Sequence, residues 1–272
     1  MHSYNHLENP FHEGVSELNQ KLVKATADVV KKEGSFTIRE TIRTEDRAAL
    51  ATLSGEIARK ISAKRMKEID EKGIAESDHR FGGKIDIDFE ASAGQGFGAF
   101  LTEGLNVSLR GEANDSVCKS MSGGSVVINP PSDSTFDPAE NAIVGNCTLY
   151  GATGGRLYVH GLAGDRFAVR NSGAVAVVEG TGLHPCEYMT NGTVAILGPV
   201  SRNVGAGMTG GVLYLRKSQL HQINEDYISP LELDEASSDE LQNLLSDYAE
   251  QTGSQTAKRF LENWNSEKVR FV

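Results

Sequence analysis

The sequence predicts a mainly β fold, a solenoid of stacked coils with helices before and after it. Between residues 83 and 211 a glycine recurs at intervals of 18 to 21 residues, apart from one interval of 31. Each glycine precedes a short run of alternating apolar residues, the pattern of a half-buried strand. These glycines are Gly83, Gly104, Gly124, Gly155, Gly173, Gly192 and Gly211. A repeat of about 20 residues is too short for a strand plus a packed helix, so we expect about seven coils of a β-solenoid.

The alternating apolar residues mark the expected strands. They are Ile85, Ile87 and Phe89; Leu105, Val107 and Leu109; Val126 and Ile128; Leu157 and Val159; Val175 and Val177; Val194 and Ile196; and Val212 and Tyr214. Between strands the chain must turn close under its neighbouring coils, where glycine has no Cβ to clash. We expect structural corners at Gly94, Gly98, Gly124, Gly151, Gly154, Gly155, Gly173, Gly207, Gly210 and Gly211. Three prolines in the long interval (Pro130, Pro131 and Pro138) predict a loop inserted into one coil.

The segment before the solenoid predicts two helices with a strand between them. The first helix has apolar residues spaced by three and four, at Val15, Leu18, Leu22, Ala25 and Val29, and Gly34 is expected to end it. Residues 36–39 predict a strand, and the second helix is marked by Leu50, Leu53, Ile57 and Ile61. The basic stretch 60–67 indicates a solvated helix face.

The segment after Leu215 predicts helices that cover the end of the solenoid. Ser238 is expected to cap a helix that Gly253 ends, and Ser254 to open another. Solenoid ends expose unpaired strand edges, so caps are expected there. We therefore divide the chain into an N-terminal lead-in (1–80), a glycine-rich β-helix (81–216) and a C-terminal helical cap (217–272).

Composition excludes several functional classes. A net charge of -10 disfavours nucleic acid and anionic membranes as partners. The sequence has neither an apolar run long enough to span a membrane nor a signal peptide, so we expect a cytoplasmic protein. Its three cysteines, Cys118, Cys147 and Cys186, are far apart, which predicts buried thiols rather than a disulfide framework or a metal site.

Two glycine-rich motifs and two histidines could suggest chemistry, but their contexts argue against it. Residues 205–210 match the dinucleotide pattern G-x-G-x-x-G, yet a strand is expected after them instead of the required helix. Residues 94–98 lack the lysine and serine of a phosphate-binding loop. His160 and His184 have no carboxylate and nucleophile at a recognisable catalytic spacing, so structural roles are favoured.

A polar cluster is expected at the turns of neighbouring coils. Asp165, Arg166, Arg170 and Asn171 lie in one turn, and Arg202 and Asn203 in a later one. These groups could bind a carboxylate ligand, form an interface or line a tunnel, or hydrogen-bond the backbone of adjacent corners, and the last role is favoured because corners leave many backbone groups to satisfy. No catalytic, cofactor-binding or metal-binding residue is predicted.

Several segments closely resemble the C-terminal domain of the glutamate synthase large subunit. They are residues 53–57 (LSGEI), 92–100 (SAGQGFGAF), 111–115 (GEAND), 149–155 (LYGATGG), 166–174 (RFAVRNSGA) and 186–189 (CEYM), together with Thr252-Gly253-Ser254 and Trp264. The resemblance covers about residues 35 to 270 and implies a right-handed parallel β-helix, the GXGXG domain. Gly96 stands where that family usually has serine, and Val204-Gly205 where it has phenylalanine and alanine, which puts tunnel or interface contacts in doubt.

The resemblance implies a non-catalytic part of an oxidoreductase. In that family the domain links a glutamine amidotransferase to an FMN-containing synthase barrel and helps to position two active sites joined by an ammonia path. Here both enzymes would be partner subunits, with FMN and an iron–sulfur cluster in them and no cofactor in this chain. The apolar stripe from Val15 to Val29 would then pack on the flavin subunit. The chain could also form a homo-oligomer.

Three other functions are compatible with a β-helix. The chain could be the β-helical subunit of a formylmethanofuran dehydrogenase-like complex, or belong to an enzyme that makes an N-substituted glutamate. A carbohydrate-active β-helix enzyme is disfavoured, because its aligned Asp or Glu residues should recur at the coil period and none do.

Overall fold

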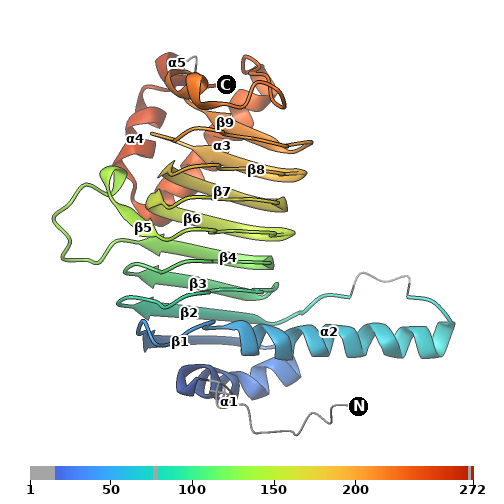
Figure 1. Cartoon of the computed structure of the whole chain (residues 1–272). Helices are drawn as coiled ribbons and strands as arrows, with labels where there is room; N and C mark the ends of the chain where they lie inside the picture. Colours follow the sequence, from blue (N-terminus) through green and yellow to red (C-terminus); the bar gives the residue numbers. More distant parts are fainter. Residues whose placement is uncertain (1–15, 76–78, 269–270) are drawn as a thin grey trace, which may run out of the picture.

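The solenoid is built on one parallel sheet whose strands stack one per coil. The computed structural model describes residues 16–75, 79–268 and 271–272, and nine strands lie in this described part. Their sheet order is β1 (Ser35–Thr41), β2 (Lys84–Glu90), β3 (Leu105–Arg110), β4 (Ser122–Asn129), β6 (Gly154–Ala163), β7 (Ser172–Thr181), β8 (Asn191–Ile196) and β9 (Val212–Leu215), with the short β5 (Ala142–Val144) paired to β6. Figure 1 shows this stack. The predicted β-solenoid of about seven coils is confirmed.

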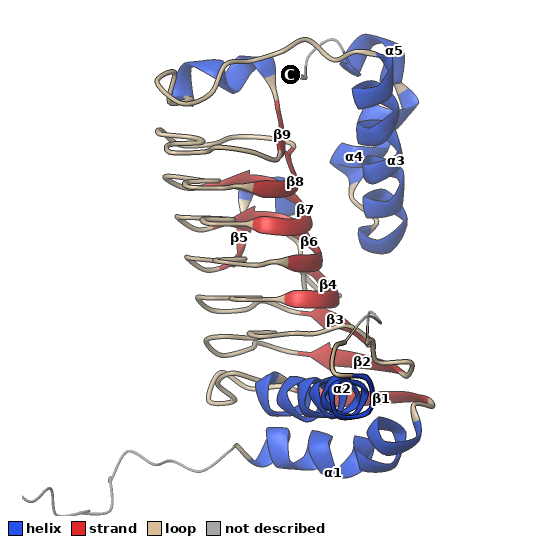
Figure 2. Ribbon diagram, turned by 90° about the vertical axis from the view of Figure 1, so that its right-hand side faces the viewer, coloured by secondary structure: helices blue, strands red, loops and turns tan. Residues whose placement is uncertain are grey.

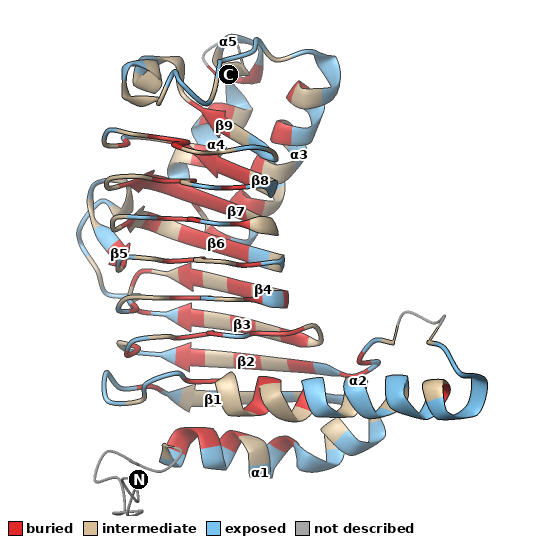
Figure 3. Ribbon diagram, turned by 45° about the vertical axis from the view of Figure 1, so that its right-hand side comes forward, coloured by how far each residue is buried: buried red, intermediate tan, exposed pale blue. Residues whose placement is uncertain are grey.

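The strand register places apolar side chains in continuous rows inside the solenoid. Ile85 pairs with Leu105, and Ile87 with Val107, which in turn pairs with Val126. All five are buried in the main core. Because neighbouring coils keep the same register, each apolar layer packs on the next, and the core extends along the whole axis, as the stacked buried strand segments in Figure 3 show.

In β7 and β9 the residues that face the solenoid core are not the ones expected from the sequence but their immediate neighbours. Ala176 and Val178 of β7 face the solenoid core, whereas Val177 belongs to a second apolar cluster outside the sheet, as does Tyr214 of β9. Helices cover the outer face there, so the strands are buried on both sides and periodicity no longer marks the inner one.

The N-terminal helices close one end of the stack. α1 (Glu17–Lys32) is capped by Ser16, and its stripe, including Leu18 and Leu22, packs against α2 (Ala51–Lys72) and the first coil. The expectation that this stripe packs on another subunit is therefore wrong for Leu18 and Leu22, whereas Ala25 is exposed and Val15 lies outside the described residues. The helix ends at Glu33, which is left-handed with φ 59°, rather than at Gly34.

The basic stretch 60–67 is only partly a solvated face. Figure 1 shows the second half of α2 extending beyond the coils. Lys60 and Lys64, however, turn back to Glu33 at the end of α1. The hydrogen bond from Lys64 lowers the pKa of Glu33, so this pair joins the two helices electrostatically.

The C-terminal helices cover half of the outer sheet face. After η2 (Lys217–Gln222) come α3 (Glu235–Thr252), α4 (Gln255–Glu262) and α5 (Trp264–Glu267). They pack over β4 and β6 to β9 (Figure 2), and no described helix covers the sheet face of β1 to β3. None of the helices in the described ranges is both long and apolar enough to cross a membrane.

The predicted caps of these helices hold with one exception. Gly253 ends α3 with φ 77°, and Ser254 caps α4 by accepting a hydrogen bond from Ala257 N. α3, however, is capped by Asp234, and Ser238 is buried inside its first turn. Asp234 and Ser238 are both good capping residues, and the side chain of Asp234 is the one that accepts from the Ser237 amide.

The loop that the prolines of the long glycine interval predict is present in the structure, and it carries η1 (Pro138–Glu140) and β5.

Candidate functional site

The predicted arginines lie on a side of the solenoid whose backbone alternates in handedness. In six successive coils every second residue of a five-residue segment is left-handed, with φ between 54° and 73°. The triplets are Gly96, Gly98 and Phe100; Ser116, Cys118 and Ser120; Cys147, Leu149 and Gly151; Arg166, Ala168 and Arg170; His184, Cys186 and Tyr188; and Asn203, Gly205 and Gly207. Ala48 and Leu50 begin the same pattern below them. We call these stacked segments the left-handed ladder.

Hydrogen bonds between coils hold this ladder. Arg166 N donates to Leu183 O of the next coil at 2.7 Å, and Arg170 N to Glu187 O at 2.8 Å. Between them, Ala168 N donates to Thr148 O of the preceding coil at 2.9 Å. A left-handed residue other than glycine costs about 1–2 kcal/mol, and the paired backbone of both neighbours offsets this cost.

The middle position of each triplet points into the core. Cys118, Leu149, Ala168 and Cys186 are all buried there. Burial raises the pKa of the Cys118 thiol well above its usual value and that of Cys186 to about 12. Both therefore lie in the core as expected, whereas Cys147, in a first position, is only half-buried.

The first and third positions face outward and bring most of the predicted polar cluster to one edge. Arg166 and Arg170 are exposed two positions on either side of Ala168, and Arg202 is exposed two coils further along. Arg166 Nη2 lies 3.0 Å from Glu187 Oε2, and the guanidinium of Arg170 lies 5.7 Å from the ring centroid of Tyr188. These contacts link side chains from successive coils.

Asn171 does not join the arginines. Its side chain is fully buried, donating to Ala174 O at 3.0 Å and accepting from Ala174 N at 2.9 Å and Gly173 N at 3.2 Å. It supports the turn that leads into β7. Asp165 also contacts backbone, because its Oδ1 accepts from Leu183 N at 2.7 Å.

Exposed aromatic rings accompany the cations on this edge. The side chain of Tyr188 is 53% exposed, although its ring packs on the next coil at Gly207, where a Cβ would approach it to 2.5 Å. Phe100, also in a third position, is 58% exposed. Lys119 lies 5.8 Å from the ring centroid of Tyr150. Sequence reasoning missed these aromatics, because only the coil register places them in line with the arginines.

The predicted corner glycines fall into two groups. Gly98, Gly124, Gly151, Gly155, Gly207 and Gly211 have positive φ. At Gly94, Gly154, Gly173 and Gly210, φ is not positive, but a Cβ would strike a backbone carbonyl of another coil.

As expected, a strand follows residues 205–210, so the dinucleotide motif lacks its helix.

A buried polar cluster lies beneath the C-terminal cap. Glu179 of β7, only 2% exposed, accepts from Ser254 Oγ at 2.5 Å and lies 3.2 Å from Tyr248 OH. His160 Nε2 is 3.8 Å from the same carboxylate. Desolvation lowers the pKa of His160, and burial raises that of Tyr248. Sequence reasoning assigned no partner to His160, but Glu179 follows it by one coil length, which is the signal that could have found it.

This cluster does not form a catalytic triad. The Ser254 hydroxyl donates to the Glu179 carboxylate and accepts from the Ala257 amide, so it is engaged with these groups and not with His160. It is also fully buried. A nucleophile must be accessible and hydrogen-bonded to its base, so we assign the cluster to the attachment of the cap.

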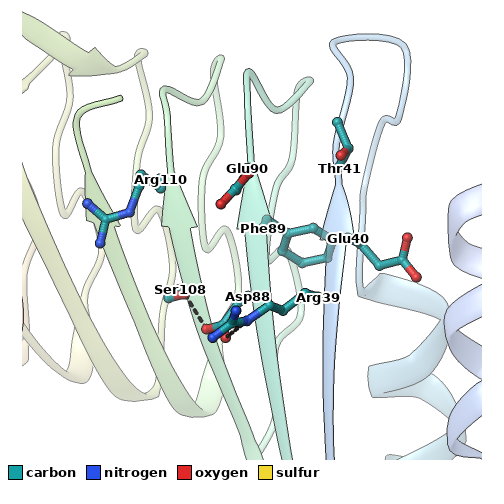
Figure 4. Close-up of a pocket in the computed structure, with 8 residues that line it drawn as sticks. All are labelled: Arg39, Glu40, Thr41, Asp88, Phe89, Glu90, Ser108 and Arg110. Atoms are coloured by element: carbon teal, nitrogen blue, oxygen red, sulfur yellow. Dashed lines mark hydrogen bonds and ion pairs between the residues drawn. The ribbon is translucent and has the colours of Figure 1, made fainter. Parts of the chain in front are cut away.

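The sheet face left bare by the helices carries a shallow polar depression of about 490 Å³. Figure 4 shows Arg39, Asp88 and Ser108 side by side on neighbouring strands of its lining. Asp88 accepts from Ser108 Oγ at 2.6 Å and pairs with Arg39 Nε at 3.4 Å, so its charge is already compensated. Within the described ranges, no group of three or more His, Cys, Asp or Glu side chains could hold a metal ion.

Comparisons with known proteins identify the family. A family model described as the GXGXG motif matches residues 19–272. The chain belongs to the GXGXG family. The ferredoxin-dependent glutamate synthase of Pyropia yezoensis is 48% identical over 195 residues, covering 70% of this chain and 13% of that protein. Ferredoxin-dependent glutamate synthase 2 of a Synechocystis strain is 44% identical, covering 83% and 14%. Glutamate synthase [NADH] of Schizosaccharomyces pombe is 41% identical, covering 96% and 12%.

The GXGXG chain is thus a glutamate synthase-type domain that spans about one eighth of these relatives. The resemblance stated from its sequence is confirmed. Five positions of the left-handed ladder, including Gly98 and Gly207, are glycine, whereas the recurring glycines that precede the strands, such as Gly124 and Gly155, lie outside the ladder. The other ladder positions hold larger residues, and these give each coil its own surface.

Proposed function

We propose that this GXGXG domain is a non-catalytic scaffold of a glutamate synthase-type enzyme. It would hold a glutamine amidotransferase part and an FMN-containing synthase part in a fixed arrangement around the ammonia path. The proposal draws on relatives named glutamate synthase, of which this domain is a small part. FMN and an iron–sulfur cluster would belong to the partners. The cytoplasmic location expected from the sequence stays a prediction.

One structural observation carries the scaffold role. The buried polar groups that could serve catalysis make internal bonds instead, as Glu179 does with Ser254 and Asn171 with the turn before β7. Cys118 and Cys186 are buried thiols with raised pKa values and cannot act as nucleophiles in that state. A stacked solenoid whose neighbouring coils are hydrogen-bonded to one another is suited to positioning other groups.

Reconstitution tests this function. The amidotransferase and synthase polypeptides of the same organism would be purified separately and assayed for glutamate formation from glutamine and 2-oxoglutarate, with and without this chain. We expect glutamine-dependent synthesis to need all three, and the chain alone to be inactive. Turnover by the isolated chain, or full activity without it, would contradict the proposal.

The same assay separates the alternatives. The relatives reported above favour glutamate synthesis over a formylmethanofuran dehydrogenase-like complex. An enzyme that makes an N-substituted glutamate would transfer an amine other than ammonia. Replacing glutamine by methylamine or ammonia in the reconstituted mixture, and identifying the product by mass spectrometry, distinguishes the two.

A further inference from the structure

The third positions of the left-handed ladder hold side chains that the fold does not require. Positive φ favours glycine, and this row does use glycine at Gly151 and Gly207. At Phe100, Arg170 and Tyr188, however, it carries large side chains that are exposed. Backbone strain combined with an exposed side chain indicates function rather than stability.

These side chains are also held in fixed positions. Arg170 stacks on the ring of Tyr188, and this ring packs on Gly207 of the following coil. Beside them, Arg166 is anchored by Glu187. A ring and a guanidinium that are ordered before binding lose little conformational entropy when a partner docks.

The most exposed charges of the edge are cations, although the protein is acidic. Lys119, Arg166, Arg170 and Arg202 are exposed along it, whereas the carboxylates of the same turns, Asp115, Asp165 and Glu187, are only partly exposed and accept from backbone amides or from Arg166. The carboxylate of Asp165 is turned to the backbone of the next coil. The chain as a whole has a net charge of -10. A cationic strip on an acidic protein complements an acidic surface and repels most of a second copy.

We propose that the cationic edge, defined by Phe100, Lys119, Arg166, Arg170, Tyr188 and Arg202, docks an acidic face of a partner protein. Tyrosine, phenylalanine and arginine are the residues that dominate protein interfaces. The inference rests on the proposed scaffold function, because the partner would be one of the enzyme polypeptides that the scaffold positions. Nucleic acid fits less well, since the net charge would oppose it.

Glycine variants test the edge without harming the fold. Arg170→Gly and Tyr188→Gly relieve the positive φ, so we expect Tm to stay within about 3 °C of the wild type. The probes are the purified amidotransferase and synthase polypeptides of the same organism, and their affinity for the immobilised chain is measured by biolayer interferometry at low and moderate salt. We expect at least a tenfold loss in each variant, and wild-type binding that weakens with salt.

Matched controls separate the edge from general effects. Ser120→Gly changes the same row without removing a large side chain, and Arg39→Glu changes charge on the bare sheet face. Both should bind like the wild type. Unchanged affinity of Arg170→Gly and Tyr188→Gly would overturn the docking edge while leaving the scaffold function standing, whereas no binding of either polypeptide by the wild type would overturn both.

Two further outcomes would show that the edge binds something other than an acidic partner protein. Self-association of the wild type in analytical ultracentrifugation, lost in Tyr188→Gly, would make the edge a contact between copies. Binding of a single-stranded oligonucleotide, lost in the same variant, would make it a nucleic-acid surface.

Discussion

The hydroxyl of Ser254 donates a 2.5 Å hydrogen bond to the carboxylate of Glu179, joining the start of α4 to β7. The same oxygen accepts from Ala257 N, so one side chain caps a helix and fixes that helix to the sheet. Both residues are buried. This contact is the polar centre of the attachment between cap and solenoid.

Replacing Ser254 by alanine should destabilise the protein by about 2–4 kcal/mol. A lost N-cap costs about 1 kcal/mol, and a buried carboxylate deprived of a donor costs more. Chemical denaturation followed by circular dichroism measures the change. Ser246→Ala, which removes an exposed hydroxyl from α3, is the control and should cost well under 1 kcal/mol. Equal effects of the two variants would show that the Glu179 contact is unimportant.

Stability should fall on acidification in a way that depends on His160. Desolvation lowers the pKa of His160 in the folded protein, so the unfolded chain binds its proton first. The stability that comes from keeping His160 neutral is therefore fully present above its pKa in the unfolded chain, about 6.5. It is lost as pH falls through the pKa of His160 in the folded protein. Tm measured between about pH 8 and 5 should decrease less steeply in His160→Gln than in the wild type. Parallel curves would contradict this prediction.

Two glycine-to-alanine changes should act in opposite directions. At Gly173 a Cβ would overlap the carbonyl oxygen of Thr153 in the preceding coil, so Gly173→Ala must push two backbones apart. We expect a loss of about 2–4 kcal/mol or a failure to fold. Gly55 lies inside α2 with nothing near its missing Cβ, so Gly55→Ala should stabilise by about 0.5–1 kcal/mol. The denaturant midpoint should fall in Gly173→Ala and rise in Gly55→Ala. If both midpoints lie above that of the wild type, or both below it, the prediction is wrong.

The thiols should differ in their reactivity. Cys118 and Cys186 are buried, and burial raises the pKa of both. Cys147 occupies an outward position in the ladder and is half-buried. In native protein at about pH 8, iodoacetamide should label Cys147 first, and the other two only after denaturant is added. Mass spectrometry of tryptic peptides identifies the labelled site, and early labelling of Cys118 would contradict the core position of the ladder's middle residues.

Much of the solenoid could be predicted because strands and close-approach glycines leave local signals. Ile85 and Ile87 alternate as inward residues should, and the coil period follows from the glycines. The inner face of β7 could not be predicted, because Val177 is buried by helices that are distant in sequence. Periodicity marks a buried face only when the opposite face meets water.

The left-handed ladder could be predicted only in fragments. Gly96 and Gly98 suggest positive φ, but Arg166, Cys186 and Tyr188 carry no such signal, since these residues rarely adopt it. Their conformation is imposed by hydrogen bonds from the coils on both sides. The partners of His160 and Tyr188 show no local pattern, because each lies one coil away in the stack and only the coil period points to it.

The alternating direction of the ladder's hydrogen bonds has a mechanical consequence. Within a single triplet the amides of Arg166 and Arg170 bond to the coil after them, while that of Ala168 bonds to the coil before. A coil tied in both directions cannot slide or tilt alone, so the stack should resist bending as a rod does. Whatever is attached near α1 and near α4 would be kept apart by a length that changes only in whole steps of about 4.8 Å, one for each coil added or removed.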